Sequence, residues 1–121
     1  MPPKTDIDTS ASLAHWQAAS ATTDALKAQF PASLARKNAT AAARTATNKR
    51  IGDALLGRYQ AGIHGRDPTI DADIVNLTAD NAAKNDAAAA HTRLVKDISS
   101  ADSTEVTLAR AHALALKGLS K

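Results

Sequence analysis

The sequence contains no cysteine, only three aromatic residues, and a single glutamate beside eleven aspartates. The absence of cysteine excludes a disulfide scaffold, thiolate metal sites and a thiol nucleophile. No stretch approaches the roughly eighteen consecutive apolar residues of a membrane span, and no apolar segment of signal-peptide length follows Met1. We therefore expect cytoplasmic synthesis without a signal peptide and no membrane-spanning helix.

Large apolar side chains are also scarce in this chain of 121 residues. Alanine supplies 29 positions, whereas Leu, Ile, Val and Phe together supply 21. Burial contributes roughly 2 kcal/mol for each large apolar side chain, while ordering a chain of this size costs on the order of 100 to 200 kcal/mol. A free-standing globule would be marginal, so we predict further burial against copies of the chain or another protein. The alanine content favours close helix contacts, although high helix propensity alone would also explain it.

Glycine and proline are confined to a few places, and apolar residues recur at spacings of three and four, which indicates helices. Pro31 is expected to end one helix, because the residue before a proline disfavours helical geometry. Small residues at 99–103 are expected to interrupt another, and Asp67 or Thr69 is expected to cap the helix after the glycine-rich loop. We predict one all-α domain over residues 1–121, an alanine-rich hairpin or bundle, compact or elongated. Its helices are expected at about 9–29, 31–61, 69–98 and 102–119, with a loop at 62–69.

Each of the first two helices is expected to bury one apolar face. For the first helix the expected face is Leu13, Trp16, Ala19, Thr23, Leu26 and Phe30. For the second it is Leu34, Ala41, Thr45, Leu55, Tyr59 and Ile63.

The helix expected over 69–98 carries a heptad stripe, whose positions alternate in steps of four and three. The ends of the stripe are apolar and its middle is polar, and polar residues at such positions fix register and partner number while lowering stability. The stripe either specifies an assembly or packs within the monomer with its middle toward solvent. The candidate assembly seam is Ile70, Ile74, Leu77, Asn81, Lys84, Ala88, His91, Val95 and Ile98.

Charge is unevenly distributed, although the net charge is only +3. Residues 25–52 hold six cations and no acid, and residues 67–102 hold seven aspartates against three cations. The cations could pair with the acidic helix of the same chain, meet the acidic face of another copy, or contact nucleic-acid phosphates without sequence preference. The candidate contacts to phosphate or to an acidic partner are Arg36, Lys37, Arg44, Lys49, Arg50 and Arg58.

The sequence shows no constellation typical of catalysis or metal binding. None of the four histidines has a second ligand at helical metal-site spacing, and phosphate-binding, dinucleotide and nucleophile-elbow motifs are missing. Asp71 and Asp73 fall in a first helical turn, where carboxylates stabilise free backbone donors. We predict no enzyme activity, cofactor, metal site or small-molecule substrate.

These observations favour a non-enzymatic, α-helical structural subunit of a larger, symmetric assembly. Its partners would be copies of itself, other structural proteins, or both. The alanine-, threonine- and aspartate-rich composition without cysteine favours a minor, virion-associated component of a bacteriophage or a similar particle. The alternative is a small basic-faced protein that uses the six cations to bind DNA without sequence specificity.

Overall fold

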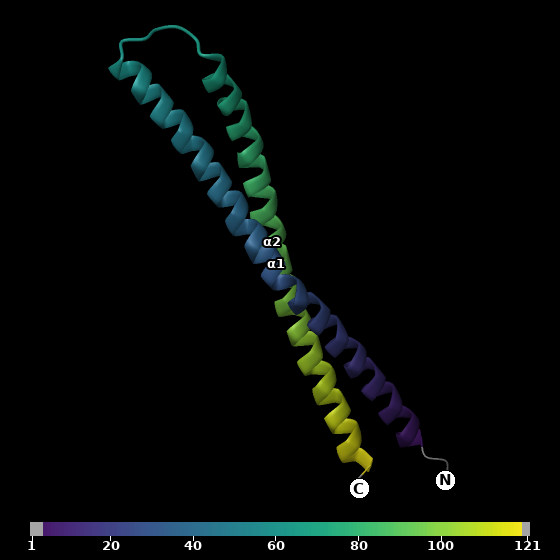
Figure 1. Cartoon of the computed structure of the whole chain (residues 1–121). Helices are drawn as coiled ribbons and strands as arrows, with labels where there is room; N and C mark the ends of the chain where they lie inside the picture. The colour runs from purple at the N-terminus through teal and green to yellow at the C-terminus, as the bar shows by residue number, and fades with distance from the viewer. Residues whose placement is uncertain (1–3, 120–121) are drawn as a thin grey trace. The chain divides into compact units, whose positions relative to one another are not determined.

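The computed structural model describes residues 4–119, with side chains described for residues 9–118. Over that range the chain forms two helices and no strand, with α1 at Lys4–Gln60 and α2 at Pro68–Leu119 (Figure 1). The predicted all-α class is confirmed. The predicted count of about four helices is wrong, and the connection spans 61–67, against the expected 62–69.

Pro31 does not end α1. A proline inside a helix lacks the N–H that would bond the carbonyl four residues earlier, and its ring crowds that turn, which together cost about 3 kcal/mol. Pro31 is exposed, so water can reach the carbonyl of Lys27. Leu26, five residues before Pro31, and Ser33, two residues after it, are both half-buried, so packing against α2 supports the helix on both sides of the proline.

The small residues at 99–103 do not interrupt α2. Serine and aspartate each cost less than about 1 kcal/mol relative to alanine inside a helix. Ile98 and Glu105 are half-buried at heptad spacing, and Asp102 forms a 3.0 Å ion pair with Lys27. Contacts with α1 therefore outweigh the weak local preference for a break.

The contacts divide the chain into two compact units, and each helix contributes to both. Unit 1 pairs α1 up to Phe30 with α2 from Arg93 onward. Its two helical segments run antiparallel, because Ser12 contacts His112 while Lys27 contacts Asp102.

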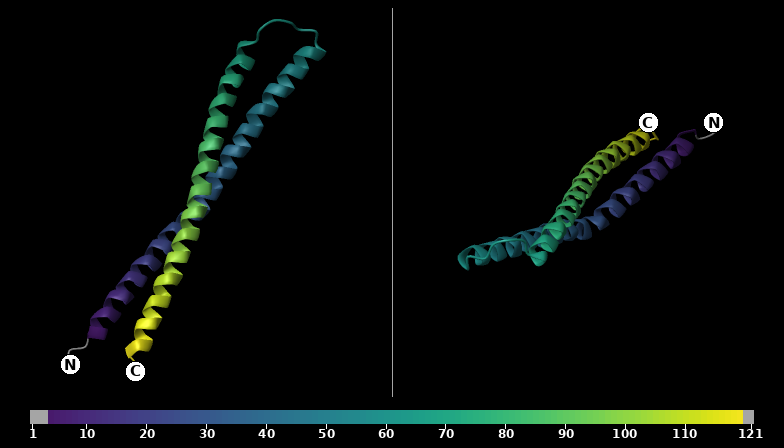
Figure 2. Two further views of the ribbon diagram at one scale, coloured as in Figure 1. Left: turned by 180° about the vertical axis from the view of Figure 1, so that it is seen from behind. Right: turned by 90° about the horizontal axis from the view of Figure 1, so that it is seen from above.

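Unit 2 comprises residues 31–92 and is a helical hairpin. Three contacts between its helices set the antiparallel register: Ser33 with His91, Arg44 with Asn81, and Arg50 with Asp73. Figure 1 and the left view of Figure 2 show its helices diverging toward the loop. The loop end of unit 2 is therefore the more open end of the hairpin.

α1 ends in a Schellman motif, which caps its last carbonyl groups. The backbone N–H of Ile63 donates to the carbonyl of Arg58 at 3.0 Å, and that of Gly62 donates to the carbonyl of Tyr59 at 3.2 Å. Gly62 has a φ of 68°, in the left-handed region that glycine adopts without steric conflict.

α2 begins at an aspartate cap. Oδ1 of Asp67 accepts a hydrogen bond from the backbone N–H of Thr69 at 2.8 Å. Pro68 occupies the first helical position, where the missing N–H would have had no helical partner. Of the two caps considered from the sequence, the structure therefore uses Asp67.

Residues facing the opposite helix recur in alternating steps of three and four along α1 and α2, as in a coiled coil. We call these positions the seam. On α1 the seam is Thr9, Ser12, Trp16, Ala19, Thr23, Leu26, Phe30, Ser33, Lys37, Thr40, Arg44, Thr47, Ile51, Ala54 and Arg58. On α2 it is Ile70, Asp73, Leu77, Asp80, Lys84, Ala87, His91, Leu94, Ile98, Ala101, Glu105, Leu108, His112 and Ala115. All are buried or half-buried except Phe30, Lys37 and Ala54.

The seam is largely polar. Among the described side chains, the buried apolar residues are Ile51, Ile70, Ala87 and Leu94, and the buried polar ones are Thr23, Thr47 and His91.

The face expected for the first helix lies mostly on the seam. The face expected for the second helix is wrong along its length, because its helical members each lie one position after a seam residue and Ile63 lies in the loop. The helical members are Leu34, Ala41, Thr45, Leu55 and Tyr59. The error is largest at the loop end. There Leu55, Tyr59 and Ile63 are 51%, 84% and 52% exposed. Because the seam residues are largely polar, the positions of the apolar side chains in this part of α1 do not show which face of the helix contacts α2.

The Schellman glycine provides a test of the loop. We expect Gly62→Ala to lower the free energy of unfolding by about 1 to 2 kcal/mol, because an alanine there would be left-handed. The control Gly57→Ala lies inside α1 and should raise stability by up to about 1 kcal/mol. An added Cβ meets no atom within 4 Å at either site, so steric crowding does not enter the comparison. Urea unfolding followed by circular dichroism measures both, and equal effects would contradict the assigned cap.

Candidate interaction surfaces

Unit 2 holds a network of polar side chains across its seam. Oγ1 of Thr47, which is 4% exposed, donates to Oδ2 of Asp80 at 2.5 Å. Nε of Arg44 donates to Oδ1 of Asn81 at 2.9 Å. These contacts satisfy polar groups that would otherwise lose hydration when the helices pack.

Most of the six candidate cations have partners within unit 2. Arg50 lies 3.2 Å from Asp73, and Arg58 lies 3.3 Å from Asp67 while also donating to the carbonyl of Gly65 at 2.8 Å. With Arg44 bound to Asn81, three of these cations bind groups of α2 or of the loop before it.

Lys49 forms a local pair instead, because its Nζ lies 2.8 Å from Asp53 one helical turn along α1. The hydrogen bond to Asp53 and its negative charge raise the pKa of Lys49 above the ordinary value for lysine. Both side chains are exposed, so the pair adds little stability.

Arg36 and Lys37 are the two candidates whose exposed side chains form no hydrogen bond or ion pair with any described residue. The structure therefore does not bring the six cations together as one free basic surface. It engages four of them within unit 2 and leaves one adjacent pair open.

The residues of the candidate assembly seam separate into two sets. Ile70, Leu77, Lys84, His91 and Ile98 lie on the seam toward α1, so the polar Lys84 and His91 do not face solvent as the monomer packing expected from the sequence would have them. The other four, Ile74, Asn81, Ala88 and Val95, each lie one position after a seam residue, and the true seam positions there are Asp73, Asp80, Ala87 and Leu94. Ile74 is 46% exposed and Val95 44% exposed, so the apolar stripe is rotated away from the intramolecular seam.

Two serine–histidine pairs lie on the seam, one in each unit, and the sequence reasoning missed them. Oγ of Ser33 and Nδ1 of His91 are 2.9 Å apart, and Oγ of Ser12 and Nδ1 of His112 are 2.8 Å apart. The imidazole tautomer sets which atom donates in each pair. Ser12 and Ser33 are three heptads apart in the sequence, and so are His91 and His112. This equal spacing was the signal that could have revealed the pairs.

The setting of these pairs favours a structural role. Nucleophilic catalysis by a serine also requires preorganised donors for the developing oxyanion. Ser12 and Ser33 lie inside α1, where the backbone N–H groups are taken up by helical hydrogen bonds. Within residues 9–118, no group of three or more His, Asp or Glu side chains is arranged to hold a metal ion.

Unit 1 carries two open hollows beside its seam. One of about 290 Å³ is lined by Lys27, Phe30, Val95 and Ile98. The hydrogen bond from Lys27 to Asp102, together with the charge of Asp102, raises the pKa of Lys27 above its ordinary value.

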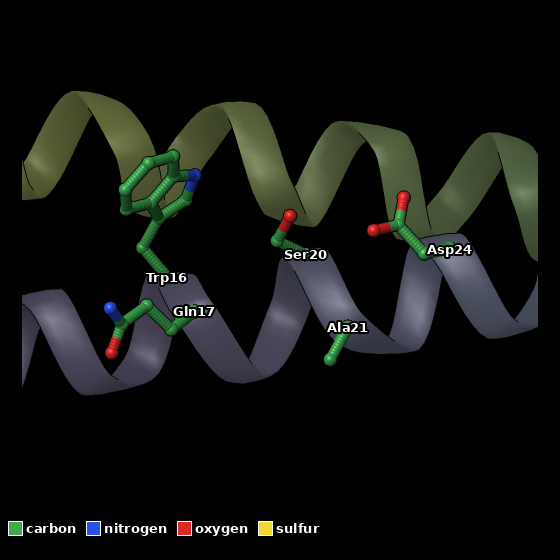
Figure 3. A pocket seen from close by; sticks show the side chains of 5 residues that line it. All are labelled: Trp16, Gln17, Ser20, Ala21 and Asp24. Carbon is green, nitrogen blue, oxygen red and sulfur yellow. The ribbon is translucent and has the colours of Figure 1, made fainter.

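The other hollow has a volume of about 340 Å³ and lies along one side of Trp16. Figure 3 shows Trp16, Ser20 and Asp24 projecting toward α2, and Ala21 pointing away from it. The Trp16 ring stacks on His112, with centroids 6.3 Å apart. Trp16 therefore contributes to the helix contact of unit 1, and the hollow beside it is an open surface of mixed polar and apolar character.

The largest group of exposed apolar side chains in unit 2 lies near its loop, and we call it the loop-end patch. Its exposed fractions range from 46% to 84%. The loop-end patch consists of Leu55, Leu56, Tyr59, Ile63, Ile74 and Val75.

Neither α1 nor α2, over the described residues, contains a segment long and apolar enough to span a membrane. No protein-family model, curated protein or solved structure matches this chain.

The buried threonine of the polar network can be tested directly. We expect Thr47→Val to lower the free energy of unfolding by about 1 to 3 kcal/mol, because Asp80 loses a buried donor. Thr45→Val is the matched control, since Thr45 is exposed and bonds only within α1; its effect should be within about 0.5 kcal/mol. Adding Asp80→Leu to Thr47→Val should restore much of the loss, because it removes the unsatisfied carboxylate. Equal effects of the two threonine substitutions in thermal unfolding would exclude this role for Thr47.

Proposed function

We propose that this chain is a non-enzymatic, all-helical structural subunit, which completes its hydrophobic core by assembling with copies of itself or with other structural proteins. The observation that carries the proposal is the distribution of apolar side chains. Four are buried among the described residues, while eleven large ones are more than one third exposed. Monomeric proteins rarely leave extended apolar patches in water.

The polar seam supports the same proposal. Hydrogen-bonded pairs across the seam fix which helix surfaces meet, but each adds only about 1 kcal/mol of net stability. The hairpin thus gains a defined register with little burial. Contact with another protein would supply the missing apolar burial and couple assembly to stability.

The proposal extends to the setting of a virus particle, as a minor structural component of a bacteriophage or a similar virion. Its support is the alanine-rich composition without cysteine, which fits a subunit made in a reducing cytoplasm and held in place by many helix contacts.

The alternative, DNA binding through the basic residues, has weaker support. Of its six candidate contacts, four already bind acidic or polar groups of unit 2. Phosphate binding would have to displace those partners, which leaves the exposed Arg36 and Lys37 as the available contacts.

Assembly predicts that folding depends on protein concentration. Sedimentation equilibrium and circular dichroism on one dilution series, from about 1 to 100 μM, should show a defined oligomer and a melting temperature that rises with concentration. Repeating the series at high salt separates apolar from charge-driven association, and apolar association should persist there. A compact monomer with a sharp melt independent of concentration would refute the proposal.

Salt dependence distinguishes the DNA-binding alternative. If only Arg36 and Lys37 contact phosphates, the logarithm of DNA affinity should fall against log salt with a slope of about −2, and the change of both residues to alanine should abolish binding. A slope near −5, with comparable losses at Arg44, Arg50 and Arg58, would show that all six cations act together and would favour DNA binding over the structural proposal.

A further inference from the structure

We propose that a second copy of this chain docks on one side of unit 2, over the loop-end patch, so that two hairpins form a four-helix bundle. The inference rests on the proposed function and adds the identity of the partner and the surface that it covers. It follows from an asymmetry between the two sides of the hairpin.

The seam defines two flanks on each helix of unit 2. In heptad notation, Ile51 and Ile70 occupy a positions, while Thr47 and Asp73 occupy d positions. Around a helix, the e and b positions follow a on one side, the g and c positions follow d on the other, and f lies opposite the seam. In an antiparallel pair the e sides of both helices lie on the same flank, as the contact between Arg44 and Asn81 at an e position illustrates.

The large apolar residues in the helices of unit 2 that lie off the seam occupy e, b and f positions. Leu55 and Ile74 at e and Tyr59 at b lie on one side of the hairpin, whereas Leu56 and Val75 at f point away from the opposite helix. The g and c positions of unit 2 hold only alanine, glycine, polar and charged residues. We call the e and b side of unit 2 the apolar flank.

Both helices contribute to this flank near the loop. Arg50 lies opposite Asp73, so Leu55 and Ile74 are within about one or two helical turns of each other along the hairpin axis. Figure 1 shows the helices diverging there, and the seam residue Ala54 is exposed as well. The apolar side chains at this end therefore lack enough partners within the hairpin.

The apolar flank exposes a substantial part of the area of an interface. Leu55, Tyr59 and Ile74 together expose roughly 400 Å², about half of the 800 Å² that one partner contributes to a standard protein interface. Tyr59, at 84% exposed, is a large aromatic side chain of the type that anchors interfaces.

The charge of the apolar flank favours a second copy over a charged partner. A two-fold contact brings the same surface of both subunits together, so like charges would meet. Among the e, b and f positions of unit 2, the charged residues are Lys49 and Asp71, and each already pairs with an opposite charge of its own chain. A nucleic acid or a strongly acidic protein would find no free cation on this flank, whereas an identical copy meets a neutral apolar surface.

Away from the loop, several side chains at e positions are also more buried than those at g positions. Leu34, Ala41 and Ala88, all at e positions, are half-buried, while Arg36 and Ala43 at g positions are exposed. Small side chains at e positions let two helix pairs approach closely, which is the packing of four-helix bundles.

The test compares two double variants that each add two lysines to unit 2. Leu55→Lys with Ile74→Lys changes the apolar flank, and Ala46→Lys with Ala79→Lys places the same charge at exposed c positions. Sedimentation equilibrium on the full chain measures self-association, and circular dichroism checks that helix content is kept. We expect the flank variant to weaken self-association by roughly 100-fold or more, as removal of central apolar contacts does. The control should stay within about threefold of the unchanged chain.

A second measurement locates the contact without altering apolar residues. The natural chain has no cysteine, so Thr78→Cys and Asn76→Cys each give a single site for a nitroxide spin label, both exposed and flanking Leu77. Thr78 lies on the apolar flank and Asn76 on the opposite side. We expect intermolecular spin–spin coupling and restricted motion at position 78 but not at position 76.

The outcomes separate this inference from the proposed function. The docking surface is wrong if spin–spin coupling is absent at position 78 and the oligomer either survives the flank substitutions or weakens equally with the control pair. Assembly through another surface would then remain. A chain that remains a folded monomer at all concentrations overturns both. If the flank variant loses helix content, the spin-label comparison decides.

Discussion

A polar heptad seam is the constraint on which the remaining structure depends. Inward positions alternate in steps of three and four along α1 and α2, yet many of them hold threonine, serine, aspartate, histidine or arginine. Hydrogen bonds such as that from Thr47 to Asp80 make this seam compatible with helix packing. Since such bonds largely replace bonds to water, the seam defines register more strongly than it adds stability.

The arrangement of the other side chains follows from the polar character of the seam. With polar residues facing inward, apolar residues such as Ile74 are placed one position later and stay half-exposed. The basic residues near the seam, among them Arg44 and Arg50, find acidic or amide partners on α2. The same geometry therefore neutralises much of the basic segment and leaves the apolar flank as the surface with the largest unused burial.

The sequence reasoning succeeded where local chemistry dominates. Helical periodicity and the lack of strand-favouring residues predicted the all-α class, and Asp67 was one of the two residues predicted to cap α2. The reasoning was wrong where packing competes with local preference. Pro31 and the small residues at 99–103 were expected to break helices, but half-buried neighbours at heptad spacing continue across both. It was also wrong about the inward face near Tyr59, because it assumed that the inward face is the apolar one.

The sequence by itself determined that the chain is helical, where its loop lies and that its apolar content is low, because these depend on residue type and on spacing along one chain. Only the tertiary structure decided which heptad phase faces the opposite helix, which cations are paired, and that Ser12 and Ser33 meet His112 and His91. These depend on the register between two helices distant in sequence. A shift of one residue turns each side chain by about 100° around the helix. The register is therefore set by the sum of the contacts between the two helices.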